Sequence, residues 1–102
     1  MTNLINQNLI SSLINNHDKV LDIGCGSGEL LYFLEKTKNI QGQGIEISHL
    51  GVKESVSKGL SVIQGDADED LINFPDNTFD VVILSDTLQA THKPKEVLEQ
   101  ML

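Results

Sequence analysis

The sequence has few basic residues and no long apolar run. Seven Lys and Arg stand against fifteen Asp and Glu, which gives a formal charge of −8. A protein that binds duplex nucleic acid needs a basic face to displace counterions, so this balance argues against a nucleic-acid partner. No apolar stretch approaches the ~18–20 residues of a membrane-spanning helix. The first ten residues also lack the basic start and apolar core of a signal peptide. We therefore expect no nucleic-acid and no membrane partner.

Cysteine is nearly absent as well. The single Cys25 excludes an internal disulfide, and with scattered histidines it forms no metal-binding framework. We therefore expect a reducing, cytoplasmic compartment and no metal site. Cys25 lies in a glycine-rich turn, where a helix N-terminus can lower the pKa of a thiol. No histidine is adjacent in sequence, so the pattern favours a small residue filling a tight turn over a reactive thiol.

What is present fits one globular domain of 102 residues, with 39% hydrophobic and 22% charged residues. Strand patterns alternate with helical patterns, which is typical of βαβ units and a Rossmann-like parallel sheet. We expect strands at 19–23, 42–47, 60–64 and 79–84, and helices at 3–16, 29–36, 49–58 and 94–102. The acidic, turn-rich residues 66–78 are expected to form a solvated loop.

Spacing within the helices gives finer expectations. The apolar residues of the first helix fall near one side and are expected to cover the sheet; they are Leu4, Ile5, Leu9, Leu13 and Ile14. Ser48 is a suitable N-cap for the helix at 49–58, and Gly59 stands where a C-terminal capping glycine belongs. His17, His49 and His92 are expected at the surface.

The fourth strand contains a four-residue apolar run at 81–84, typical of a strand buried on both faces. With the strand order 3-2-1-4, its outer edge would have no partner, and a bare apolar edge promotes aggregation. We therefore expect residues 1–102 to be the N-terminal half of a larger domain. Alternatively, a second chain or a tail covers the edge, and self-association through strand 79–84 is one such arrangement.

The ligand-binding feature of the sequence is the stretch 19–29, KVLDIGCGSGE. It predicts a short strand carrying Asp22, then a glycine-rich turn, then the start of a helix. Glycines allow positive φ angles and a close approach of ligand to backbone. The helix start presents unpaired N–H groups. Together these elements predict a binding corner of the nucleotide type.

Phosphorylated ligands fit this corner poorly. In the dinucleotide fingerprint G-x-G-x-x-G, Gly24 and Gly26 match, but Glu29 holds the sixth position and the third glycine comes early, at Gly28. A pyrophosphate also prefers positive potential, whereas the corner holds Asp22 and Glu29. No Lys-Ser/Thr pair follows the glycines, so a Walker loop is excluded. S-adenosylmethionine suits the acids better, because it carries an ammonium, a sulfonium, a ribose diol and an adenine amine.

Further acids stand at the ends of the next two strands. Glu46 lies 18 positions after Gly28, where a carboxylate can accept hydrogen bonds from both ribose hydroxyls. Asp66, with Ala67, follows the third strand, where an adenine edge would lie. Each acid also has a structural interpretation. Asp22 could accept hydrogen bonds from the N–H groups of the glycine loop, which is the favoured reading, and Glu46 and Asp66 could be solvated strand ends.

These motifs resemble a known family. VLDIGCGSGE, GIEIS, VIQGDAD and FDVVILSDTLQATHKP are similar to class I S-adenosylmethionine-dependent methyltransferases, and more narrowly to the MetW family of methionine biosynthesis proteins. The narrower resemblance rests on residues 62–66 and above all on 85–91, and it covers nearly the whole chain from Asn16. It implies a seven-stranded sheet of which this chain has four strands. It also implies S-adenosylmethionine as cofactor, S-adenosylhomocysteine as product, and a homoserine O-acyltransferase as partner.

Two functions remain open. The first is methyl transfer to an acceptor that the sequence does not identify. It needs positioning more than an acid or base, because the sulfonium is already activated, so no catalytic residue is assigned. The second is a non-catalytic cofactor-sensing subunit of the acyltransferase. Ser85 and Asp86 could face a substrate, but the start of a loop is favoured. The candidate cofactor-binding residues are Asp22, Gly24, Cys25, Gly26, Gly28, Glu46, Ile47, Asp66, Ala67 and Ser85.

Overall fold

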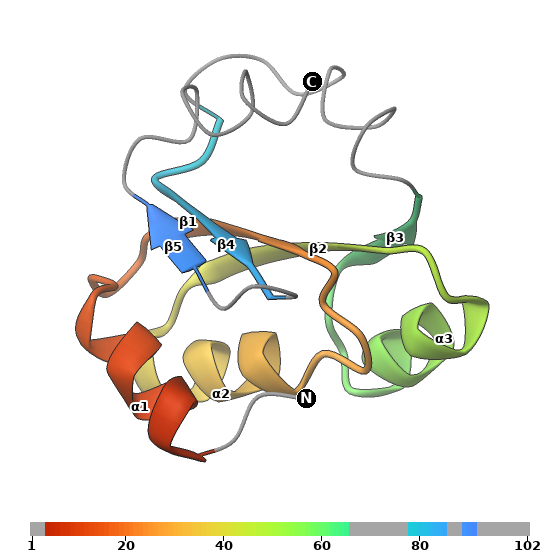
Figure 1. The fold of residues 1–102 in the computed structure, drawn as a ribbon, viewed down its shortest axis with the longest axis horizontal. Coiled ribbons are helices and arrows are strands. Elements are labelled where there is room, and N and C mark those ends of the chain that lie inside the picture. The colour runs from red at the N-terminus through yellow and green to blue at the C-terminus, as the bar shows by residue number, and fades with distance from the viewer. Residues whose placement is uncertain (1–3, 66–77, 86–88, 92–102) are drawn as a thin grey trace.

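A computed structural model of the chain describes residues 4–65, 78–85 and 89–91 (Figure 1). The elements in chain order are α1 (Leu4–Ser12), β1 (Lys19–Ile23), α2 (Glu29–Lys38), β2 (Gln41–Glu46), α3 (His49–Ser57), β3 (Val62–Gln64), β4 (Val81–Leu84) and β5 (Gln89–Thr91). The loop expected at 66–78 lies largely outside the described ranges. The helix expected at 94–102 and His92 lie wholly outside them. Of the helices described, none is long and apolar enough to cross a membrane.

The strands described form one sheet in the order β3-β2-β1-β4-β5. β1 pairs in parallel with β2 on one side and with β4 on the other, and β2 pairs in parallel with β3. The expected order 3-2-1-4 is therefore confirmed. This order places the first strand at the centre of the sheet.

The outer edge of β4 is not bare, so that expectation was wrong. β5 pairs antiparallel with β4, aligning Val82 with Thr91 and Leu84 with Gln89. The chain thus covers this stretch of the edge with its own residues, and self-association through strand 79–84 loses the argument on which it rested. The segment Gln-Ala-Thr was not recognisable as a strand, because three residues with one small apolar member show no periodic pattern.

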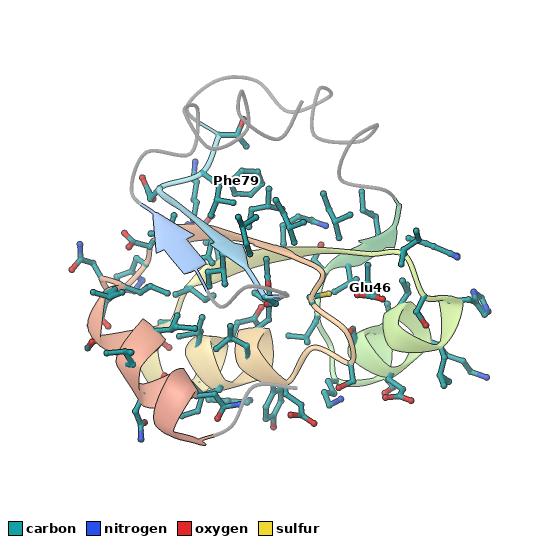
Figure 2. All side chains as sticks on the ribbon, in the orientation of Figure 1. Glu46 and Phe79 are labelled. Atoms are coloured by element: carbon teal, nitrogen blue, oxygen red, sulfur yellow. The ribbon has the colours of Figure 1, made fainter. Side chains whose placement is uncertain are left out.

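The helices α1, α2 and α3 lie on the same side of the sheet in Figure 1. Strand side chains alternate between the two faces. Val20, Val81 and Ile83 therefore pack toward the helices, in a buried cluster with residues of α1 and α2. Leu21, Ile45 and Val82 are buried on the opposite face, where Phe79 packs against them (Figure 2). Burial on both faces explains why these strands read as continuous apolar runs.

The buried side of the first helical segment was predicted only in part: Ile14 was expected to face the sheet and is buried, whereas Leu9 and Leu13 are exposed and Ile10 is buried in their place. Ile10 and Ile14 are 4% and 1% exposed, whereas Leu9 and Leu13 are 63% and 49% exposed. The pairs 9/13 and 10/14 have the same helical spacing and lie only about 100° apart around a helix. Both include strong apolar residues, so periodicity alone did not separate them. The side chains of residues 4–6 are outside the described set.

The predicted ends of α3 are confirmed. The Ser48 side chain accepts a hydrogen bond from the Gly51 backbone N–H at 3.3 Å, which makes Ser48 the N-cap. Lys58 is the C-cap, and Gly59 follows it with a φ of +83°. A left-handed residue at this position is the ordinary way to end a helix, and glycine adopts it without steric cost.

The buried face of α1 can be tested with neighbouring substitutions. We expect Ile10→Ala to lower the free energy of unfolding by about 2–4 kcal/mol, because it leaves a cavity in the cluster shared with α2. Leu9→Ala should change it by less than about 0.5 kcal/mol, because Leu9 is exposed. Urea unfolding followed by circular dichroism measures both values. Equal losses would contradict the assignment of the buried side.

Candidate functional site

The carboxyl ends of the central strands meet at one edge of the sheet. β1 leads into the glycine turn at 24–28, β2 ends at Glu46, and β4 leads into Ser85. The Ser85 backbone N–H donates to the Ile23 carbonyl at 3.0 Å, and the Gly65 N–H donates to the Glu46 carbonyl at 3.0 Å. The structure therefore brings the predicted residues of these three strands together. Asp66, Ala67 and Asp86 lie outside the described residues.

Two of the three glycines in the turn, Gly26 and Gly28, have different roles. Gly26 has a φ of +58°, and a Cβ built there would meet nothing within 4 Å. Gly28 has a φ of +84°, and a Cβ there would lie 2.8 Å from the Ser55 hydroxyl oxygen and also clash with Leu60. Gly28 is thus required by packing within the protein. Gly26 instead keeps open space next to the backbone, as expected of a turn that a ligand approaches closely.

Glu46 is tied to this turn through its carboxylate. One carboxylate oxygen accepts from the Gly26 backbone N–H at 2.8 Å, and the other accepts from the Ser48 backbone N–H at 2.9 Å. The residue is only 9% exposed and lies between the turn and α3 (Figure 2). The interpretation of Glu46 as a solvated strand end was therefore wrong. A carboxylate has about four acceptor positions, so roughly half of its capacity remains for other donors.

Asp22 is fully buried at the centre of the sheet. The Ser85 hydroxyl donates a hydrogen bond to its Oδ1 atom, which joins β1 to the residue following β4. The N–H groups of Gly24 and Gly26 donate instead to the Ile45 carbonyl and to Glu46. The favoured role of Asp22, as acceptor for the glycine loop, was therefore wrong for these groups. The bond to Asp22 supports the reading of Ser85 as a structural loop start.

The Cys25 side chain points into the protein core and is 8% exposed. Its side chain belongs to the core cluster beneath the sheet. Gly44 makes room for it, since a Cβ at position 44 would lie 2.7 Å from the sulfur. Burial, and then the charges of Asp22 and Glu46, raise the pKa of Cys25 to about 12. The thiol is protonated at neutral pH, which supports a space-filling role, and Cys25 could meet a cofactor only through its backbone.

Three residues of α3 and its C-cap contact the turn and were not anticipated. A Cβ at Gly51 would lie 2.9 Å from both the Gly26 carbonyl oxygen and the Glu46 Cγ. The Ser55 hydroxyl donates to the Gly26 carbonyl at 3.0 Å, and the Lys58 ammonium donates to the Ser27 carbonyl at 2.8 Å. The signal in the sequence that could have predicted these contacts is the pair of small residues at 51 and 55. Residues four positions apart lie on the same side of a helix, and two small ones let the helix approach the turn closely.

Apolar side chains are exposed beside Glu46. Ile47 is 70% exposed directly after it, and Leu50 is 63% exposed in the first turn of α3. His49 is also exposed, as predicted, with its Nδ1 atom 3.4 Å from the Gln64 side-chain oxygen. The edge of the sheet thus combines a buried carboxylate with accessible apolar surface.

Comparison with known proteins identifies the family of the chain. The family described as "Methionine biosynthesis protein MetW" matches residues 5–102 of the sequence. The chain belongs to the MetW family. It is 32% identical over 106 residues to the bifunctional methionine biosynthesis protein MetXA/MetW of Rhodopirellula baltica, a match that covers 96% of this chain and 17% of that protein.

A second curated relative is the mitochondrial arginine-hydroxylase NDUFAF5 of Rattus norvegicus. It is 33% identical over 81 residues, covering 79% of this chain and 24% of the relative. The MetW chain therefore spans a quarter or less of the length of these two relatives.

Solved structures share the fold. A methyltransferase described as S-adenosylmethionine-dependent, from Thiobacillus denitrificans, superposes with a TM-score of 0.71 at 22% identity, covering 98% of this chain and 44% of that one. A TehB-like methyltransferase from Corynebacterium glutamicum gives a TM-score of 0.67 at 23% identity, with 78% and 42% covered. The predicted Rossmann-like fold of the class I methyltransferase type is thereby confirmed.

The protonated state of Cys25 gives a pH prediction. Because its pKa rises from 9.0 to about 12 on folding, the stability that the protonated thiol contributes is complete below pH 9 and is lost as the pH rises toward 12. At pH 8 the folded protein should hold about a thousandfold less thiolate than the unfolded chain. A chromogenic disulfide reagent should therefore react slowly with native protein and rapidly in urea. Equal rates would contradict the buried, protonated thiol.

Proposed function

We propose that this MetW-family chain binds S-adenosylmethionine at the carboxyl edge of its sheet and acts as a cytoplasmic methyltransferase-like protein of methionine biosynthesis. The observation that carries the proposal is the arrangement of Glu46 and Gly26. The carboxylate is fixed by two backbone N–H groups and keeps acceptor capacity, directly beside the open face of the turn.

The residues present fit the parts of this cofactor. The open face of Gly26 would allow the methionine portion to approach the backbone. The remaining lone pairs of Glu46 would accept hydrogen bonds from the ribose hydroxyls, as acids at this position do in related folds. Ile47 offers exposed apolar surface next to Glu46. Contacts of Asp66 and Ala67 with the base belong to the proposal on sequence grounds alone.

The electrostatics of the turn favour a cation. Asp22 and Glu46 both raise the pKa of the Cys25 thiol, so the potential they create at the turn is negative. A bound pyrophosphate would be repelled by that potential, whereas an ammonium and a sulfonium would be attracted. This supports S-adenosylmethionine over NAD or ATP, which also carry ribose and adenine.

The cofactor would supply a methyl group that is already activated. The chain's own contribution would be orientation and placement rather than acid–base catalysis. Glu46 would hold one end of the ligand, and the glycine turn, fixed by α3, would hold the other. The description of the Thiobacillus denitrificans structure as a complex with S-adenosylhomocysteine supports the same class of ligand.

A second candidate function is a non-catalytic, cofactor-sensing subunit of a homoserine O-acyltransferase. It is favoured by the relative whose name joins MetXA and MetW in one bifunctional protein. That this partner is a homoserine O-acyltransferase is what the family resemblance implies. Formation of S-adenosylhomocysteine with cell extract would favour the enzyme. Co-purification with an acyltransferase, with a cofactor-dependent change in its rate, would favour the subunit.

Calorimetry tests ligand choice and the role of Glu46. The protein should bind S-adenosylmethionine and show no heat with NAD or ATP. Glu46→Gln keeps the size of the side chain but loses the charge, and one charge-assisted hydrogen bond is worth ~1.5–3 kcal/mol. The affinity of the Glu46→Gln variant for S-adenosylmethionine should fall roughly tenfold to a hundredfold. Unchanged affinity in the folded variant would remove Glu46 from the ribose site.

Gly26 can be tested against a glycine of the same backbone type. Gly26 and Gly59 both have positive φ and open space around a built Cβ. An alanine at either position should cost about 1–2 kcal/mol of stability through backbone strain. Only Gly26→Ala should also weaken S-adenosylmethionine binding, by at least about tenfold, because its methyl group would occupy the ligand's space. Equal affinities for the two variants would show that Gly26 does not contact the cofactor.

A further inference from the structure

The Gly26 residue is held at both of its backbone groups by side chains. Its N–H donates to the Glu46 carboxylate at 2.8 Å, and its carbonyl accepts from the Ser55 hydroxyl at 3.0 Å. No side chain of its own restrains it, and a Cβ there would touch nothing. Glycine has the widest backbone freedom of any residue. These two hydrogen bonds, one from β2 and one from α3, therefore fix its orientation.

Ser55 is well placed to carry the second bond. It is fully buried, although its neighbours on α3, Glu54 and Val56, are exposed. The Ser55 hydroxyl lies against the glycine turn. A Cβ built at Gly28 would lie 2.8 Å from the Ser55 hydroxyl oxygen. Without the Ser55 hydroxyl, the part-buried carbonyl that accepts this second bond would keep only the weak Cys25 thiol donor, whose sulfur lies 3.9 Å away, so losing the Ser55 bond is costly.

Two neighbours on the same element make this approach possible. Gly51, one turn earlier, lets α3 come within contact distance of the Gly26 carbonyl. Lys58, at the C-cap, donates to the next carbonyl of the turn, that of Ser27, at 2.8 Å. Lys58 is exposed, and exposed ammonium groups contribute little through such bonds. The hydrogen bond from the buried Ser55 hydroxyl is thus the stronger of the two.

We propose that Ser55 is a positioning residue for cofactor binding, acting through the Gly26 peptide. By fixing the carbonyl of Gly26, it keeps the N–H of Gly26 aligned with Glu46 and keeps the open face of the turn accessible. If the turn is already ordered in the free protein, binding does not have to supply the free energy of ordering it, and the affinity is higher. The effect on affinity rests on the proposed function, whereas the effect on the turn does not.

The test compares Ser55→Ala with Ser57→Ala in the full chain. Ser57 lies on the same helix, is exposed, and donates only to the carbonyl of Glu54, so its substitution is a matched control. Calorimetry is carried out at a temperature where circular dichroism shows both variants folded. We expect Ser55→Ala to weaken S-adenosylmethionine binding roughly tenfold and Ser57→Ala to leave it unchanged. Wild-type affinity in folded Ser55→Ala would overturn the proposal.

A second readout needs no ligand. The Gly26 carbonyl and the Ser27 N–H belong to one peptide unit, so the Ser27 amide resonance reports the bond from Ser55. In ligand-free protein that resonance should move in Ser55→Ala and stay in place in Ser57→Ala. A resonance that stays in place in both would overturn the positioning role. If wild-type protein binds no S-adenosylmethionine, the proposed function fails, and the Ser27 resonance still decides whether Ser55 holds the turn.

Should Ser55→Ala fail to fold, Ser55→Cys takes its place. Cysteine keeps a side chain of the same shape, somewhat larger than serine, and replaces the hydroxyl with a weak donor. Reduced affinity with a shifted Ser27 resonance would support the proposal. Wild-type affinity and an unshifted resonance would overturn it.

Discussion

The hydrogen bond from the Gly26 N–H to the Glu46 carboxylate links the two halves of the site. Glu46 is nearly buried, and a carboxylate out of water must find donors. It takes one from the turn after β1 and one from the start of α3, at Ser48. The bond therefore sets the position of the glycine turn relative to β2 and to the Glu46 carboxylate. Without it, neither the Glu46 carboxylate nor the turn would have a defined place.

Small residues create the space in which this bond forms. Gly44 on β2 admits the Cys25 side chain, which anchors the turn in the core. Gly51 lets α3 approach Glu46 and the Gly26 carbonyl. Gly28 makes room for Ser55 and Leu60. The helix α3 supports the turn from outside the sheet, so the order of the site depends on tertiary packing as well as on the turn's own sequence.

Local signals in the sequence were sufficient for much of this architecture. The strand–glycine–helix pattern, the Ser48 cap and the helix-ending Gly59 depend on neighbours in the chain, and they were predicted correctly. The buried side of α1 was predicted only in part, with Ile14 right and Leu9 and Leu13 wrong, because the Leu9 and Ile10 sides are equally apolar and only the packing on α2 separates them. β5 and the bonds from Ser55 and Ser85 were missed for a related reason. They join residues far apart in sequence, and a single serine or a three-residue strand carries no periodic signal.

The central claim is that Glu46 and the glycine turn together form the binding site for a cationic adenosyl compound. Titration of ¹⁵N-labelled protein with S-adenosylhomocysteine, followed by amide resonances, addresses it most directly. The account predicts that the amides of Gly26 and Ser48, the two donors to Glu46, are among the resonances that shift most. It would be contradicted if those two amides stayed in place while others moved, or if NAD shifted them and S-adenosylhomocysteine did not.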